Sequence, residues 1–196
     1  AAIDAYLTLV RQHGLFDADA IARVDSWTAA RRLAHTNRPA PRSALDAKFS
    51  VQYCVARALL HGKVAFEHFE GDAWRDPVVH GLLPRIHAAP FTAAQFPPDN
   101  HNGAEIKVTL VDGRTYSAKV ERALGRTAQN PIPLEQLQAK FEDCALRVLT
   151  PEAVRAVARM IDSFEELGSV REFTALLEPV PVGKSDARRM LERSSA

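Results

Sequence analysis

The strongest constraint on the fold lies near the middle of the chain, where two alternating segments flank a tight turn. In AEIKVTLVDGRTYSAKVE, residues 104–121, apolar and polar residues alternate over 106–110 and again over 116–120. Asp112-Gly113 lies between the two segments. A period of two on both sides of an Asp-Gly turn is typical of a β-hairpin with one buried face. The fold must therefore contain a sheet.

Helical patterns lie on both sides of this hairpin. Residues 1–13 carry an apolar stripe at helical spacing and end at Gly14, a favourable C-cap. Residues 21–28 fit a helix or a strand, and we favour a strand because polar and apolar residues alternate there. A short helix is expected in DPVVHGLLPRIHAAP, broken near Gly81 or Pro84.

The C-terminal part changes character and predicts three helices, in LEQLQAKFEDCALRVL, TPEAVRAVARMIDSFEEL and SVREFTALL. Thr150 and Ser169 are expected N-caps of the second and third helix. The sequence thus predicts an α+β fold: a small mixed-sheet domain over residues 1–125, C-terminal helices over 126–178, and a tail over 179–196 that is disordered or weakly helical.

Composition excludes several classes of function. The 196 residues carry a net charge of +1, so no global field recruits nucleic acid, and no apolar run is long enough to span a membrane. Cys54 and Cys144 lie in amphipathic patterns far apart in the sequence, which favours packed free thiols and a cytoplasmic protein.

No metal or other cofactor is predicted. The chain has no glycine-rich phosphate loop, and its histidines lack the spacing of metal ligands (His61, His68, His80, His87 and His101).

A stiff basic loop precedes the most informative helical pattern, NRPAPRSALDAKFSVQYCVARALLHGK, residues 37–63. Ser43 is the expected N-cap of one helix that runs to about residue 61, where Gly62 ends it. A helical wheel places four polar residues on a solvent-facing strip, namely Asp46, Ser50, Arg57 and His61. Lys48 and Gln52 fall on the opposite, apolar side, which Tyr53 flanks.

A lysine on an apolar face has two interpretations. Its head group either reaches past the apolar surface to solvent, or it belongs to an anion site at the start of the helix. Arg38 and Arg42 in the preceding loop support the anion site, although both also fit a solvated loop. Gln52 and Tyr53 would add hydrogen-bonding groups for a carboxylate-rich small molecule.

The stretch HTNRPAPRSALDAKFSVQYCVARALLHGKV resembles the signature of the MmgE/PrpD family, which includes 2-methylcitrate dehydratase, cis-aconitate decarboxylase and iminodisuccinate epimerase. DPVVHGLLPRI, EIKVTLVDGRTYSAKVE and NPIPLEQLQAKFEDCA resemble the family in order and spacing. The resemblance implies that the chain holds the family's small domain and the C-terminal helices of its large helical domain, without the first half of that helical domain.

The resemblance also implies a reaction. Family enzymes abstract a proton next to a carboxylate, without a metal or redox cofactor, at a site between the two domains. Tyr53 and Lys48 are the implied catalytic residues, and Arg42 matches as a carboxylate-binding residue. Arg38, Gln52 and His35 complete the predicted substrate-binding set.

The predicted function is therefore part of a cofactor-independent carboxylate lyase, a dehydratase of a 2-methylcitrate-like substrate in propionate catabolism. The alternatives are a family decarboxylase or epimerase, or a non-catalytic ligand-binding or interaction module. The expected partners are a di- or tricarboxylate and a second copy of the chain in a dimer. Because the implied bases lie outside this sequence, we expect the chain alone to be inactive.

Overall fold

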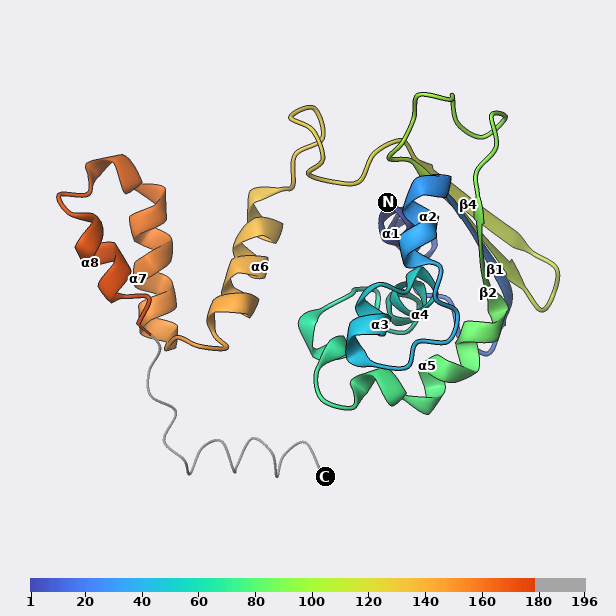
Figure 1. Cartoon of the computed structure of the whole chain (residues 1–196), viewed down its shortest axis with the longest axis horizontal. Helices are drawn as coiled ribbons and strands as arrows, with labels where there is room; N and C mark the ends of the chain where they lie inside the picture. Colours follow the sequence, from blue (N-terminus) through green and yellow to red (C-terminus); the bar gives the residue numbers. More distant parts are fainter. Residues whose placement is uncertain (179–196) are drawn as a thin grey trace. The chain divides into compact units, whose positions relative to one another are not determined.

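The computed structural model describes residues 1–178, and the tail predicted over 179–196 lies outside the described residues. The chain divides into two compact units, residues 1–131 and residues 132–196, and each unit is described by itself (Figure 1). The domain boundary expected at residue 125 stays a prediction.

The first unit contains four strands and five α-helices. In chain order they are α1 (Ala2–His13), β1 (Ile21–Thr28), α2 (Ala30–Thr36), α3 (Ala44–Lys48), α4 (Val51–His61), α5 (Pro77–Leu82), β2 (Ile86–Pro90), β3 (Ala104–Leu110) and β4 (Thr115–Val120). Short 3-10 turns lie at Phe66–Phe69, Ala73–Arg75 and Leu83–Arg85.

The strands form one mixed sheet in the order β2-β1-β3-β4, which confirms the α+β class. β1 is parallel to β2 and antiparallel to β3, and β3 is antiparallel to β4. The hairpin predicted over 104–121 and the strand predicted over 21–28 are both confirmed. With these directions, β1, β2 and β4 end at the same edge of the sheet at which β3 begins.

β2 was not predicted from the sequence. Its residues, IHAAP, contain one large apolar side chain and follow directly on a Leu83–Arg85 turn, so they carry no alternating signal. Pairing with β1 makes this segment a strand, from Val24 opposite Ile86 to Thr28 opposite Pro90. Pro90 is tolerated because β2 is an edge strand.

The core lies between one face of the sheet and helices α1 and α4 (Figure 1). Alternate residues of β3 are buried there, from Ile106 to Leu110, together with Tyr6 and Leu9 of α1. The intervening β3 residues are partly exposed on the opposite face. The amphipathic alternation of the hairpin therefore sets which face the helices cover.

The prediction of a single helix over residues 43–61 is wrong, because this segment forms two helices, α3 and α4. Ser43 caps α3 as expected, and its side chain accepts a hydrogen bond from Asp46 N. Ser50 caps α4, accepting one from Tyr53 N at 3.0 Å. A second N-cap inside an apparently continuous pattern restarts the helix.

This break overturns the predicted solvent-facing strip. Ser50 and Arg57 are buried, with 1% and 4% exposure, whereas Asp46 is half-buried and His61 is exposed. Leu45 and Phe49, two large apolar residues of the same segment, are exposed by 64% and 48%. The break changes the helical phase before α4, whereas Arg57 lies within α4 and is buried against Asp76 and Ala73.

The second unit is described over residues 132–178 and is helical. It contains α6 (Leu134–Ala145), α7 (Pro151–Asp162), a 3-10 turn at Phe164–Glu166, and α8 (Val170–Ala175). The three predicted helices are confirmed, as are the caps: Thr150 accepts from Ala153 N and Ser169 from Arg171 N.

The two cysteines are both free, as expected, but only one is packed. Cys54 in α4 is partly buried, whereas Cys144 in α6 is exposed. Over residues 1–178, none of the helices combines the length and the apolar character that a membrane crossing requires.

Candidate functional site

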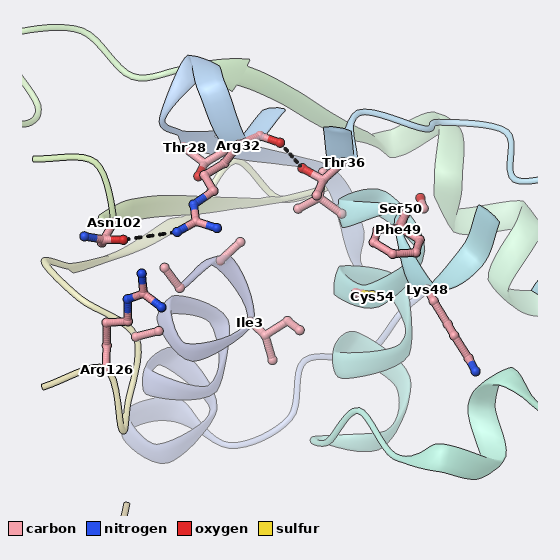
Figure 2. A pocket seen from close by; sticks show the side chains of 14 residues that line it. Ile3, Thr28, Arg32, Thr36, Lys48, Phe49, Ser50, Cys54, Asn102 and Arg126 are labelled. Atoms are coloured by element: carbon pink, nitrogen blue, oxygen red, sulfur yellow. Dashed lines mark hydrogen bonds between the residues drawn. The ribbon is translucent and has the colours of Figure 1, made fainter. Parts of the chain in front are cut away.

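A pocket of about 380 Å³ lies in the first unit, at the sheet edge where β1 ends and β3 begins (Figure 2). Its polar lining includes Arg32, Lys48, Ser50, Asn102 and Arg126, together with the thiol of Cys54. Three of the fourteen lining residues are cations, and none is an aspartate or glutamate. The pocket therefore favours an anionic ligand.

Strand directions explain why residues far apart in sequence meet here. Arg32 lies in α2, which follows β1, while Asn102 lies two residues before β3 and Arg126 follows β4. These three strand ends share one edge of the sheet. Arg32 Nη2 donates to Asn102 Oδ1 at 3.3 Å, which joins two of the three segments directly.

The opposite side of the pocket lies at the start of α4. Ser50, Val51 and Cys54 line it, and Lys48 extends from the end of α3 (Figure 2). Lys48 is exposed, and its Nζ lies 5.4 Å from the centre of the Phe66 ring. An anion site at a helix N-terminus was predicted at Ser43, and the pocket instead adjoins the N-terminus of the eleven-residue helix α4.

Cys54 lines the pocket as a partly buried thiol. Burial raises the pKa of its thiol to about 11, so the protonated form dominates.

Arg38 and Arg42 lie in a different hollow, around Asp46. Arg38 forms an ion pair with Asp46 Oδ1, and Arg42 N donates to Asp46 Oδ2 at 3.2 Å. The hydrogen bond from Arg42 N and the pairing with Arg38 lower the pKa of Asp46. A carboxylate of the protein is therefore already paired with Arg38, and the structure does not bring these two arginines together with Lys48 in one pocket.

Gln52 and His35 flank the same loop. Gln52 is 2% exposed, donates to Asn37 Oδ1 at 2.7 Å and accepts from Arg38 N at 3.2 Å. His35 lies in α2 rather than in a loop, and its carbonyl oxygen accepts from Arg38 Nε at 3.4 Å. These contacts hold the 37–42 loop against α4, and the substrate-binding roles of both residues stay predictions.

Tyr53 is fully buried, at 0% exposure. Its hydroxyl lies 2.5 Å from the carbonyl oxygen of His68 and 3.1 Å from that of Ala73, and accepts from Arg57 Nε at 3.0 Å. Burial raises the pKa of the phenol, which keeps it protonated. In this arrangement Tyr53 anchors the segment over residues 66–75, and any catalytic contact requires that segment to move.

Next to this anchor, His68 makes the first unit sensitive to acid. His68 Nδ1 accepts from Ala65 N at 3.1 Å, and burial together with the nearby His61 lowers the His68 pKa below 6.5. The folded state therefore binds fewer protons than the unfolded state, so the free energy of unfolding falls as pH falls through about 6.5.

We expect urea midpoints measured between pH 8 and pH 5 to show this loss, and to show a shallower one in His68→Gln. Because other groups also titrate, the difference between the two proteins is the measured quantity. Parallel curves for the two proteins would contradict the assignment to His68.

Sequence reasoning missed Arg32, Asn102 and Arg126. No local motif marks them, because each lies in a separate segment and only the strand order brings the segments together. Within the described range 1–178, no group of three or more histidine, cysteine, aspartate or glutamate side chains is arranged to hold a metal ion.

The fold and the pocket define an α+β domain with a cationic pocket at one edge of its sheet. The model of the MmgE/PrpD C-terminal domain matches residues 1–166. The chain therefore belongs to the MmgE/PrpD family, as the resemblance of its sequence implied.

Two curated relatives are similar to the chain over most of its length. Cis-aconitate decarboxylase from Mus musculus is 28% identical over 189 residues, which cover 94% of this chain and 37% of that protein. Cis-aconitate decarboxylase from Homo sapiens is 28% identical over 175 residues, covering 87% of this chain and 34% of that protein. The chain thus spans about a third of the length of these relatives.

Proposed function

We propose that the chain is the C-terminal part of a lyase that acts on a small di- or tricarboxylate. The observation that carries this proposal is a pocket in the family-matched domain with three cations and no acidic lining residue. Such a pocket suits carboxylate groups, which bind arginine and lysine through charge-assisted hydrogen bonds.

Two reactions fit this class of substrate. The sequence signature favoured loss of water from a 2-methylcitrate-like substrate, and the names of the two relatives favour loss of carbon dioxide from cis-aconitate. Both reactions require that the carboxylates of the substrate are held in a fixed orientation. In this proposal the cations of the pocket bind and orient them. A 28% identity over a third of each relative favours the substrate class more strongly than either reaction.

In this proposal Lys48 binds a substrate carboxylate, and Tyr53 is a proton donor. Lys48 is exposed at the pocket and makes no ion pair among the described residues. Tyr53 has the protonated phenol that a donor needs, but it reaches a substrate only after residues 66–75 move away from its hydroxyl. The base that abstracts the substrate proton comes from polypeptide outside this sequence.

We expect the chain alone to bind polycarboxylates weakly and to show no turnover. An open pocket leaves its charges screened by solvent, so the affinity should be millimolar, about −4 kcal/mol, and should fall with added salt. NMR titration with citrate, 2-methylcitrate and cis-aconitate measures it through amide shifts at Lys48, Ser50 and Cys54. Shifts confined to residues far from the pocket would contradict the proposal. Turnover by the chain alone would contradict the assignment of the base to polypeptide outside this sequence.

Three lysine and arginine variants separate the two candidate hollows. Lys48→Ala should weaken citrate binding, whereas Lys63→Ala removes a cation that is already paired with Glu67 and serves as the matched control. Arg42→Ala tests the original prediction that the loop arginines bind substrate. A stronger effect from Arg42→Ala than from Lys48→Ala would move the site to the hollow around Asp46.

The second candidate is a ligand-binding or interaction module without chemistry. The buried, fully engaged hydroxyl of Tyr53 favours it, because the proposed proton donor is then not available to a ligand in the pocket. The exposed apolar side chains of the second unit favour a protein partner. A pure interaction module should show no response to citrate in the same titration, whereas a ligand-binding module should bind without turnover.

A further inference from the structure

We propose that Arg32, Asn102 and Arg126 form a carboxylate-binding subsite at one end of the pocket. Figure 2 shows the side chains of Arg32 and Arg126 directed toward the same part of the pocket beside Asn102, whereas Lys48 points away from them. The identity of the ligand rests on the proposed function, but the anion-binding property does not.

Two hydrogen-bonded anchors hold the loops that carry these residues. Asn100 Oδ1 accepts from Asn102 N at 2.9 Å and from Gly103 N at 2.7 Å, while Asn100 Nδ2 donates to Glu121 Oε2 at 2.7 Å. Asn100 therefore ties the loop before β3 to the end of β4. Leu124 N donates to Asp4 Oδ2 at 2.9 Å, which fixes the Arg126 loop to α1.

A close approach of the backbone also fixes the Asn102 loop. A Cβ atom at Gly103 would lie 2.5 Å from the Phe96 ring, which is 1% exposed. The loop can pack this closely on Phe96 only with glycine at this position. Packing of Gly103 on Phe96 therefore fixes the backbone next to Asn102, which restricts where the Asn102 side chain can lie.

The charges at this end of the pocket are unbalanced. Arg32 and Arg126 make no ion pair among residues 1–178, and Asp4, the acid at the base of the Arg126 loop, is not a lining residue. Asn102 holds Arg32 through its carbonyl oxygen, which leaves its Nδ2 protons for another acceptor. Two guanidinium groups with no acidic lining residue repel each other, and a bound anion offsets that repulsion.

A carboxylate fits this set of donors. Guanidinium groups bind planar oxyanions through paired N–H donors, and the amide of Asn102 supplies an additional neutral donor. Inorganic phosphate shares part of this chemistry. The experiment must therefore compare citrate, phosphate and acetate.

The test is NMR titration of the whole chain with the three anions. We expect Arg32→Gln and Arg126→Gln each to weaken citrate binding about tenfold, because each removes a charged donor. Arg31→Gln and Arg122→Gln remove the same charge from exposed neighbours that do not line the pocket, and both should bind citrate as the unmodified chain does.

Asn102→Asp supplies a variant that keeps both arginines. The new carboxylate would lie at the oxygen position that Arg32 Nη2 already contacts, so it would pair with Arg32 and repel the ligand. We expect citrate binding to be lost and the melting temperature without ligand to be unchanged or higher. A purely structural role for the three residues predicts lower melting temperatures in the Arg32→Gln and Arg126→Gln variants without ligand, and that result would overturn the subsite.

The remaining outcomes separate the subsite from the proposed function. Citrate binding that depends on Lys48 but not on Arg32 or Arg126 overturns the subsite and leaves the proposed function intact. Phosphate binding through both arginines, with no response to citrate, 2-methylcitrate or cis-aconitate, overturns the carboxylate assignment and the proposed function together.

Discussion

Replacement of Arg57 by methionine should lower the free energy of unfolding of the first unit by about 3 kcal/mol, since it breaks a buried charge network. Arg57 is 4% exposed, and its Nη1 lies 2.9 Å from Asp76 Oδ2. Its other donors reach the hydroxyl of Tyr53 and the carbonyl oxygen of Ala73. Methionine keeps the apolar stem but leaves these acceptors without their donor.

The loss should be localised as well as large. Arg57 joins α4 to the segment that ends at Asp76, so urea unfolding should show a lower midpoint, and hydrogen exchange should quicken at residues 66–75. Arg38→Met is the matched control, because it breaks an ion pair whose arginine is exposed and should cost much less. Equal effects of the two substitutions would contradict the role given to Arg57.

The buried network of Arg57 shows where prediction from the sequence reaches its limit. Local signals were sufficient for Ser43 and Thr150 as caps and for the hairpin around Asp112-Gly113, because each depends on residues within a few positions. The burial of Arg57 depends on Asp76 and Ala73, which approach from a segment without regular periodicity. The helical wheel therefore assigned Arg57 to the solvent face, although its side chain has partners in the interior.

The candidate site shows the same limit more strongly. Lys48 was singled out because a helical wheel over residues 43–61 placed it on an apolar face, whereas it is exposed at the end of α3, and its role stays a prediction. Arg32, Asn102 and Arg126 have no such local signal, since their proximity follows from the antiparallel pairing of β1 with β3 and of β3 with β4. The strand order places their loops at one edge, and only β3 and β4 could be paired from the sequence.

The second unit is expected to self-associate through its exposed apolar side chains. Val154 and Val157 of α7 are buried, but Ile161 and Phe164 at its end are exposed by 48% and 46%. Other exposed apolar residues of this unit lie in α6 or just after it, and in α8 or just after it (Leu134, Leu137, Leu146, Val148, Val170 and Leu177). Exposed apolar side chains in this number favour association or binding of a partner.

Light scattering at rising protein concentration, with a hydrophobic dye as the second readout, measures this association. The double variant Ile161→Ser, Phe164→Ser should weaken association about tenfold or more, because each large side chain contributes on the order of 1.5–3 kcal/mol when buried. Val111→Ser, which removes a 70% exposed side chain at the hairpin turn, is the matched control and should change neither readout. A reducing agent keeps the exposed Cys144 from forming disulfides between chains. A monomer that stays stable at high concentration and binds no dye would contradict the expected association.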